Sequence, residues 1–320
     1  MTQARTNQMK CNICGGAGHV RLPHFNLKVC DAHFLQLVER RVERAIQKFK
    51  MFDRASRVLV AVSGGKDSLS LWHALHRLGY APDALFIRLG VTPEVERAQA
   101  LVQKAAAALP GRLHVLDATS YFGGASVQEV ARMLRRPVCA VCGLVRRYLM
   151  NKFACEHGYD VLATGHNMTD EATALLGNLL HWQDGYLQRQ WPVLPKSHPR
   201  FAAKVKPLAL NYEQDIKQYA VLRGIEHLEE SCPFAAGATS RLYKRLLTEL
   251  EQAQPGIIGA FYLGYIRRGK IQAEPVKLQD CQQCGYPTTI PVCAFCRLLE
   301  QFSRKRKVAF SSDSAEAQAS

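Results

Sequence analysis

The sequence lacks any run of about 20 consecutive apolar residues, the length that a membrane-spanning helix requires. It also lacks a positively charged start followed by an apolar stretch, the pattern of a secretory signal, so we expect a cytoplasmic protein without a membrane segment. Acidic residues are scarce: 27 Asp and Glu stand against 42 Lys and Arg, for a formal net charge of +15. On charge alone, a polyanionic partner (nucleic acid first) and a merely solvated basic surface are nearly balanced.

Repeats of fold-defining length are absent as well. The chain has 320 residues, 48% of them apolar, which excludes wholesale disorder and suits one large domain with accessories, or two domains. Cysteine, by contrast, is plentiful. Eleven cysteines in a chain with no export signal favour metal ligation over disulfides.

A strand–turn–helix pattern surrounds the hexapeptide SGGKDS at 63–68. The apolar, β-branched run 58–62 predicts a buried parallel strand, and a helix follows from Leu69. Glycines let the backbone approach an anion closely, and the start of the helix offers N–H groups and a positive dipole end. The motif therefore predicts a phosphate-binding loop. It lacks the GxxxxGK[ST] spacing of a Walker A loop, which disfavours a kinase or GTPase.

Strands and helices alternate on either side of this loop. We expect strands at 58–62, 84–89, 113–117 and 160–164, with helices at 68–79, 94–108, 126–135, 143–157 and 169–181. Such alternation is typical of an α/β fold with a doubly wound parallel sheet, where ligands bind outside the carboxyl ends of the strands. An irregular loop is expected at 183–210, followed by helices at 211–224 and 240–268.

Two cysteine-rich segments have the ligand spacing of structural zinc sites. Zinc takes four sulfur or nitrogen ligands in a tetrahedron, and a CxxC turn places two thiolates on one side of the ion. Each segment supplies four ligands and leaves no open coordination position, so two structural Zn²⁺ ions are predicted. The ligands are Cys11, Cys14, Cys30 and His33 in the first segment, and Cys281, Cys284, Cys293 and Cys296 in the second.

The central pair Cys139 and Cys142 has no second pair nearby. Cys232, in a Glu-Ser-Cys-Pro turn, is a candidate third ligand. Three cysteines from distant segments suit an iron–sulfur cluster with an open iron site. A dithiol redox pair or an incomplete zinc site fits almost equally well on sequence alone. Cys155 falls in a predicted helix, where a small buried side chain is the better interpretation.

The segment 165–172, GHNMTDEA, follows the strand at 160–164 and opens another helix, so its polar groups should face the phosphate loop. Asp170 is a candidate for holding Mg²⁺ or orienting a nucleotide. His166 and Asn167 are candidates for binding phosphate or stabilising the turn. Thr169 or Asn167 is the expected N-cap of the helix.

Together these motifs resemble the tRNA 2-thiouridine synthetases of the TtuA type and their relatives that thiolate the wobble uridine. The resemblance runs from Cys11 to about Arg297 and includes SGGKDS, CxxCG with a distant Cys-Pro, and GHNxxDEA. It implies a PP-loop ATP pyrophosphatase fold (adenine nucleotide alpha hydrolase-like) flanked by N- and C-terminal zinc modules. The tRNA 2-thiocytidine synthetases share the PP-loop and central cysteines but lack the flanking modules, so they fit less well.

The resemblance also implies a two-part site. It makes Cys139, Cys142 and Cys232 the ligands of a 4Fe–4S cluster with one open iron, and catalytic together with Asp170 and Arg146. It places ATP with Mg²⁺ at Ala61, Val62, Ser63, Gly64, Gly65, Lys66, Asp67, Ser68, Ile87, Arg146, Gly165 and Asp170. Two positions depart from the family pattern. Arg146 stands where lysine is expected, and Thr169 stands where an acidic residue is common, so that role falls to Asp170.

The implied reaction is ATP-dependent replacement of uridine O2 by sulfur, giving 2-thiouridine in tRNA, with the T-loop uridine favoured over the wobble uridine. ATP is split into AMP and pyrophosphate, while Lys66 and Arg146 offset the developing charge. A basic helix around Arg40, Arg41, Arg44 and Lys48 is expected to grip the tRNA backbone with the zinc modules. Sulfur is expected to arrive as free sulfide or from a carrier protein. The resemblance also allows a homodimer, for which the sequence carries no mark.

Two other classes of function compete with this interpretation. One is a PP-loop sulfurtransferase that acts on a small molecule, and the other is a non-catalytic zinc/iron–sulfur RNA-binding protein. The preferred interpretation divides the chain into six segments: a disordered start at 1–9, an N-terminal zinc finger at 10–34, a basic linker helix at 35–55, a catalytic domain at 56–270, a zinc ribbon at 271–300 and a disordered tail at 301–320.

Overall fold

The computed structural model describes residues 9–90, 92–187, 190–229, 232, 234, 239–269 and 277–316, with side chains as far as residue 307. Most of the predicted disordered start and the first six residues of the predicted zinc ribbon therefore lie outside the described residues. None of the described helices combines the length and the apolar character needed to span a bilayer.

A six-stranded sheet forms the centre of the molecule, in the order β5-β4-β3-β6-β8-β7. The five strands from β5 to β8 are parallel, and β7 is antiparallel at one edge. Because β3 has β4 on one side and β6 on the other, the strand order reverses there, which confirms the predicted doubly wound α/β class. The strands are β3 (Val58–Val62), β4 (Asp83–Arg88), β5 (Leu113–Asp117), β6 (Val161–Thr164), β7 (Val193–Leu194) and β8 (Ala203–Val205).

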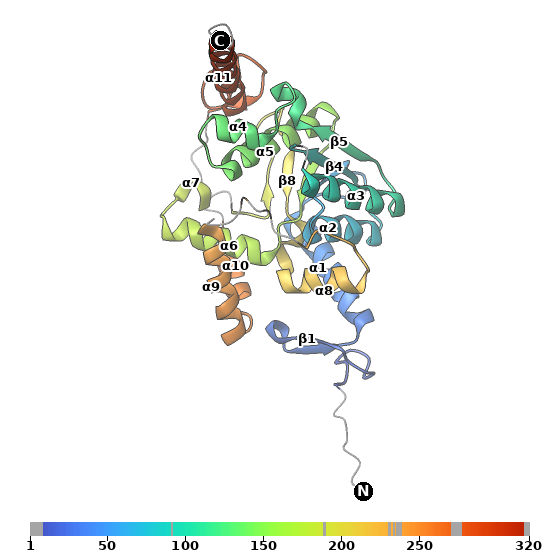
Figure 1. Cartoon of the computed structure of the whole chain (residues 1–320). Coiled ribbons are helices and arrows are strands. Elements are labelled where there is room, and N and C mark those ends of the chain that lie inside the picture. The colour runs from blue at the N-terminus through green and yellow to red at the C-terminus, as the bar shows by residue number, and fades with distance from the viewer. Residues whose placement is uncertain are drawn as a thin grey trace.

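Helices cover both faces of the sheet (Figure 1). Alternate residues of a strand point to opposite faces, so Val58 and Val60 belong to one buried cluster and Leu59 to another. The first cluster joins the sheet to α1 (Asp31–Phe49), α2 (Lys66–Arg77), α3 (Pro93–Ala108) and α8 (Glu213–Leu222). The second joins it to η2 (Ala118–Phe122), α4 (Val127–Met133), α5 (Val138–Glu156) and α11 (Ala294–Glu316).

A third apolar cluster lies to the side of the sheet and links the helices that follow β6 and β8. Met168 and Tyr262, both buried, are at its centre. In Figure 1 these helices form the left-hand side of the molecule. They are α6 (Met168–Leu180), α7 (Asp184–Leu187), α9 (Thr239–Ala253) and α10 (Ile257–Arg267), with the 3-10 turn η3 (Pro207–Leu210) beside them.

The two cysteine-rich segments lie at opposite ends of the molecule (Figure 1). The N-terminal one is a hairpin of β1 (Val20–Leu22) and β2 (Leu27–Val29) around the turn η1 (Pro23–Phe25). The C-terminal one pairs β9 (Gln279–Asp280) with β10 (Pro287–Thr288) before α11 begins. Each hairpin runs into a long helix, α1 or α11, that packs on the sheet domain.

The predicted irregular loop at 183–210 is wrong in part, because it contains α7, β7, β8 and η3. Strand β8 is too short to stand out in sequence, yet it extends the sheet next to β6. The single helix predicted at 240–268 is two helices, since Pro255 cannot continue α9 and Gly256 takes a left-handed φ of 95°. Helix α5 begins at Val138 rather than at 143, which places Cys139 in its first turn.

The disordered tail predicted from residue 301 is also wrong over its first part, because α11 continues to Glu316. Phe302 is buried and meets the ring of Phe122 edge-on, 5.9 Å between centroids. Lys305 and Arg306 donate hydrogen bonds to backbone carbonyls of neighbouring elements. Burial of one aromatic face offsets the entropy of ordering this stretch, which its basic composition alone does not reveal.

Candidate functional site

The phosphate loop between β3 and α2 closes on itself through Ser68. Its Oγ accepts a hydrogen bond from the Ser63 N–H (3.1 Å) and donates one to the Gly65 carbonyl (3.0 Å). Gly64 has φ of 79°, and a Cβ there would lie 2.9 Å from the Ala98 Cα, so no side chain fits. The loop thereby presents the start of α2, with its unpaired N–H groups, at the carboxyl end of the sheet.

The β6–α6 turn touches this loop through Gly165. A Cβ on Gly165 would meet the backbone of α2 at 2.8 Å from the Ser68 N and 2.9 Å from the Asp67 carbonyl carbon. Asn167 caps α6: its Oδ1 accepts from the Asp170 N–H (3.0 Å), and its Nδ2 donates to Asp67 Oδ1 (3.0 Å). Asn167 therefore fills the predicted N-cap role and also ties the two ligand-binding turns together.

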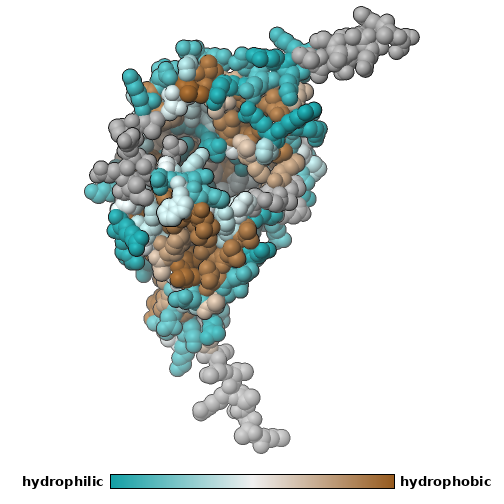
Figure 2. Space-filling view, turned by 90° about the vertical axis from the view of Figure 1, so that its left-hand side faces the viewer, coloured by the Kyte–Doolittle hydropathy of each residue, from teal (hydrophilic) through white to brown (hydrophobic). Residues whose placement is uncertain are grey.

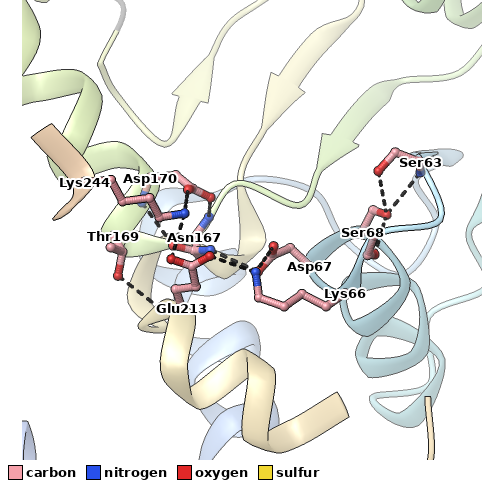
Figure 3. Close-up of polar contacts among 10 residues, drawn as sticks. Ser63, Lys66, Asp67, Ser68, Asn167, Thr169, Asp170, Glu213 and Lys244 are labelled. Carbon is pink, nitrogen blue, oxygen red and sulfur yellow. Dashed lines mark hydrogen bonds and ion pairs between the residues drawn. The ribbon is translucent and has the colours of Figure 1, made fainter. Parts of the chain in front are cut away.

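A network of charged side chains lies at the start of α2. The Lys66 ammonium is 2.9 Å from Asp67 Oδ2 and 2.8 Å from Glu213 Oε1. The Lys244 ammonium is 2.9 Å from Asp170 Oδ1 and 2.7 Å from Glu213 Oε2. Figure 3 shows these groups converging, while Ser63 and Ser68 lie on the other side of the start of α2.

Burial shapes the ionisation of this network. It raises the pKa of Asp67, against the opposing effect of Lys66. Burial also acts to raise the pKa of Glu213, but Lys244 and Lys66 outweigh it and the pKa falls below its usual value. Glu213 thus stays ionised as the carboxylate between two ammonium groups. Sequence reasoning missed Glu213 and Lys244, because α8 and α9 carry no motif that marks them as neighbours of the loop.

One cavity of about 390 Å³ unites residues predicted for ATP with those predicted for a cluster. Ser63 and Gly65 line it from the phosphate loop, and Ile87 lines it from the end of β4. The remaining predicted residues on its wall are Cys139, Cys142, Arg146 and Cys232. The phosphate loop and Cys232, which are more than 160 positions apart in the sequence, therefore line the same cavity.

The three cysteines of this cavity differ from the two tetrads in spacing. A single metal ion with metal–sulfur bonds of about 2.3 Å holds its sulfurs about 3.8 Å apart. Among the described residues, the four ligand atoms of each tetrad lie within 4.8 Å of one another, whereas Cys139, Cys142 and Cys232 do not form such a group. The Cys139 thiol donates to the Phe234 carbonyl (3.1 Å), and burial raises the pKa of Cys142. A multi-metal cluster fits this donor set better than one ion.

A second cavity, of about 1080 Å³, lies on the other side of the phosphate loop. Lys66, Asp67 and Glu213 line it from the charged network, and Gly65 lines both cavities. The other predicted ATP residues line neither cavity. Ala61 and Val62 lie in β3, Gly64 and Gly165 in the turns, and Ser68 and Asp170 at the starts of α2 and α6.

Both predicted tetrads are assembled. In each, the four ligand atoms lie within 4.8 Å of one another. In the N-terminal tetrad, His33 Nδ1 is 3.1 Å from the Cys30 sulfur. In the C-terminal tetrad, burial opposes ionisation of Cys281, but backbone N–H groups hold its pKa down at about 6. The Cys293 N–H is 3.2 Å from that sulfur. These donor sets suit a tetrahedral ion with no open position.

Helix α1 is less available to a ligand than its basic sequence suggests. Arg41 is not part of an exposed basic face: it bonds to the buried Asp215 (2.7 Å), which also bonds to His24 (3.0 Å). The Arg41 guanidinium also stacks 3.9 Å from the centre of the Phe25 ring. This buried network fastens the N-terminal hairpin to α8. Arg40, Arg44 and Lys48 remain exposed.

The fold and the phosphate loop define a PP-loop protein, and the PP-loop domain family model matches residues 35–234. The chain belongs to the family of the tRNA-5-methyluridine(54) 2-sulfurtransferases. It is 59% identical to that protein of Thermotoga maritima over 299 residues, which are 93% of this chain and 98% of the relative. It is 43% identical to the Thermus thermophilus protein (93% and 94% covered) and 37% identical to the Pyrococcus horikoshii protein (96% and 98% covered).

Among solved structures, the chain shares its fold with the U34-tRNA thiolase NcsA from Methanococcus maripaludis, solved with its [4Fe-4S] cluster. The TM-score is 0.78 at 22% identity, covering 92% of this chain and 97% of that chain. This likeness confirms the arrangement of elements along almost the whole chain.

Proposed function

We propose that this protein is a tRNA 2-sulfurtransferase that replaces O2 of the T-loop uridine by sulfur, using ATP. One observation carries the proposal: a single cavity is lined by the phosphate loop, by Arg146 and by three cysteines. A nucleotide-activating loop and a sulfur-ligating group must face the same base if one is to activate the oxygen and the other to supply its replacement. Relatives of up to 59% identity bear the name of this activity and give the position of the uridine.

The metal groups implied by this function fit the residues present. Cys139, Cys142 and Cys232 would hold a 4Fe–4S cluster, which supplies an open iron position for sulfur when it is bound. The N- and C-terminal tetrads would each hold one structural Zn²⁺. Asp67, Asp170 and Glu213 would offer oxygen ligands to the Mg²⁺ that accompanies ATP.

The side chains of the site then have distinct tasks. The N–H groups at the start of α2 and the Ser63 hydroxyl bind the phosphates, while Ser68 holds the loop closed. Ile87 packs beside the adenine. Lys66 and Arg146 offset negative charge as uridine O2 attacks the α-phosphorus and the bond to pyrophosphate breaks. Sulfur then adds at C2 and AMP leaves with the original oxygen. Hydrosulfide as the sulfur source balances the reaction, because its proton ends on pyrophosphate.

Substrate access follows from the same geometry. A uridine inside a folded tRNA must leave its stack to reach a cavity lined by Ile87 and the cysteines. Water is kept from the activated base by the apolar part of that lining, which includes Phe86, Val95 and Phe234. The proposal keeps the predicted division into two zinc modules around a catalytic domain at 56–270. Homodimer formation and a carrier protein as sulfur donor stay predictions.

The test is a thiolation assay on anaerobically reconstituted protein with unmodified tRNA. Cys139→Ala, Cys142→Ala and Cys232→Ala should each abolish 2-thiouridine formation while ATP binding survives. Cys155→Ala is the matched control, because Cys155 is a half-buried cysteine of α5 that does not line this cavity. Full activity in the three cavity variants would refute the proposal. Mapping the thiolated nucleoside by mass spectrometry separates the T-loop from the wobble position.

The competing classes have their own signatures in this assay. A small-molecule sulfurtransferase would thiolate free nucleosides as readily as tRNA. A non-catalytic RNA-binding protein would bind tRNA yet never convert ATP to AMP. The intact phosphate loop, closed by Ser68 and held against Gly165, speaks against the second class.

A further inference from the structure

We propose that the surface formed by the end of α4 and by α11 binds the tRNA backbone beside the cysteine-lined cavity. This proposal rests on the proposed function. We call this the α4/α11 surface and define it by Arg132, Arg135, Arg136, Arg304, Lys305 and Lys307, all of them exposed. The charges come from two segments about 170 positions apart in sequence, so only the packing of α11 on α4 and α5 brings them together (Figure 1).

Hydrogen bonds hold the end of α4 and helix α11 together. Arg136 donates to the Gln301 side-chain oxygen (2.9 Å), and Lys305 donates to the Met133 carbonyl (3.1 Å). On the inner side of α11, Phe302 is buried against Phe122. The cations are therefore presented on a fixed platform, which limits the entropy lost when a ligand binds.

Negative charge on this platform is sparse. Residues 132–136 and 303–307 contain no acidic side chain. Glu300 lies 3.4 Å from Arg304, and Glu129 completes the capping box of α4 with Ser126. The hydrogen bonds of Arg136 and Lys305 described above end on neutral oxygens. These two bonds therefore do not neutralise the positive charges of Arg136 and Lys305. Gathering like charges destabilises a folded protein, and a polyanion such as RNA offsets that cost.

The position of the surface suits a substrate that must enter the cavity. Val127 and Gln128 from the start of α4 line the cavity, as do Val138 and Cys139 from the start of α5. Arg135 and Arg136 lie in the short connection between these two helices. A backbone bound at the α4/α11 surface would therefore hold its nucleotides next to the proposed sulfur-transfer group. Figure 2 shows hydrophilic side chains interspersed with hydrophobic ones at this end of the molecule, and a larger hydrophobic area lower on the same face.

The experiment compares two triple variants of the full-length protein in tRNA binding and thiolation. Arg132→Gln/Arg135→Gln/Arg304→Gln removes charge from the α4/α11 surface. Arg54→Gln/Arg57→Gln/Arg112→Gln removes equal charge from exposed side chains that precede β3 and β5, at the amino-terminal edge of the sheet. Binding of unmodified tRNA is measured at several salt concentrations, together with ATP binding and thermal melting. Unchanged ATP binding and melting show that each variant is folded.

We expect the first triple variant to bind tRNA on the order of tenfold more weakly, with the slope of log K against log salt reduced by about 1 for each phosphate that the variant no longer neutralises. Its KM for tRNA should rise while kcat stays constant. The second triple variant should bind and thiolate tRNA like the unmodified protein. Unchanged affinity and salt slope in the first variant would overturn this surface alone. Failure of the unmodified protein to bind any tRNA would instead overturn the proposed function.

Discussion

Substitution of Gly165 by alanine isolates the contact between the two ligand-binding turns. The glycine has an ordinary backbone conformation, so alanine adds no strain of its own, only a methyl group. That methyl carbon would lie 2.8 Å from the Ser68 N and 2.9 Å from the Ser68 Cα, where ordinary contact begins near 3.4 Å. The obstacle is the backbone of a helix, which no side-chain rotation relieves. The β6–α6 turn and the start of α2 must therefore separate by about 0.6 Å.

The expected cost follows from this separation. Forcing a methyl group into a packed site destabilises proteins by about 1–3 kcal/mol. We also expect an effect on activity, because a misplacement of about 1 Å at a catalytic site can lower the rate about 100-fold. A shift of about half that size predicts a loss of about tenfold in kcat/KM for ATP, on the same logarithmic scale. Separation of the two turns also stretches the hydrogen bond from Asn167 to Asp67, which adds to the loss of activity.

The assay is ATP affinity and ATP-to-AMP turnover with tRNA, alongside thermal melting. Gly264→Ala is the matched control: it lies inside α10 with nothing within 4 Å of the added carbon, so it should leave activity unchanged and raise stability slightly. A Gly165→Ala protein with unchanged ATP affinity and turnover would show that the close approach of the two turns does not position the phosphate loop.

Three further outcomes are expected. Glu213→Gln should lower kcat/KM for ATP by about 10–100-fold, because Lys66 and Lys244 lose the carboxylate between them. This loss corresponds to a charged hydrogen bond of about 1.5–3 kcal/mol. Glu213→Asp should recover part of the activity, and equal activity in the two variants and the unmodified protein would show that this carboxylate does not position the lysines. Burial lowers the pKa of His73 from 6.5 to about 4. Between these pH values the unfolded chain binds a proton at this histidine that the folded protein does not, so the stability is at its full value above pH 6.5 and falls as the pH drops toward 4. His73→Gln should flatten the fall of melting temperature over that range, and an unchanged profile would count against it. Cys293→Ser should lose one equivalent of zinc in metal analysis and melt at lower temperature; retention of both equivalents would contradict the C-terminal site.

The parts that sequence predicted well are those whose geometry is local. The turn at 63–68, the cap at Asn167 and the two cysteine tetrads each depend on residues within about 25 positions, and backbone geometry over such distances follows from glycine, capping and ligand spacing. The sheet strands β3 to β6 were equally predictable, because their apolar runs are bounded by clear turn residues.

Three of the errors share one cause, because each depended on a partner distant in sequence. Strand β8 has three residues and exists because β6 offers it a ladder. The basic stretch at the C-terminal end of α11 begins as an ordered helix because Phe302 packs against Phe122 of η2. Arg41 was expected on a tRNA-binding face, but Asp215 from α8 holds it inside the molecule. In each case packing overrode composition, which describes only the side chains themselves.

The sequence by itself determined the class of fold, the phosphate loop and the two cysteine-rich tetrads, because these follow from short-range spacing. Only the tertiary structure decided that the loop and three distant cysteines share one cavity, that Glu213 and Lys244 complete the charged network, and that α4 and α11 form one basic surface. The physical reason is that these groups meet through the burial of apolar faces of helices. That burial is a property of the whole folded chain, and no local motif records it.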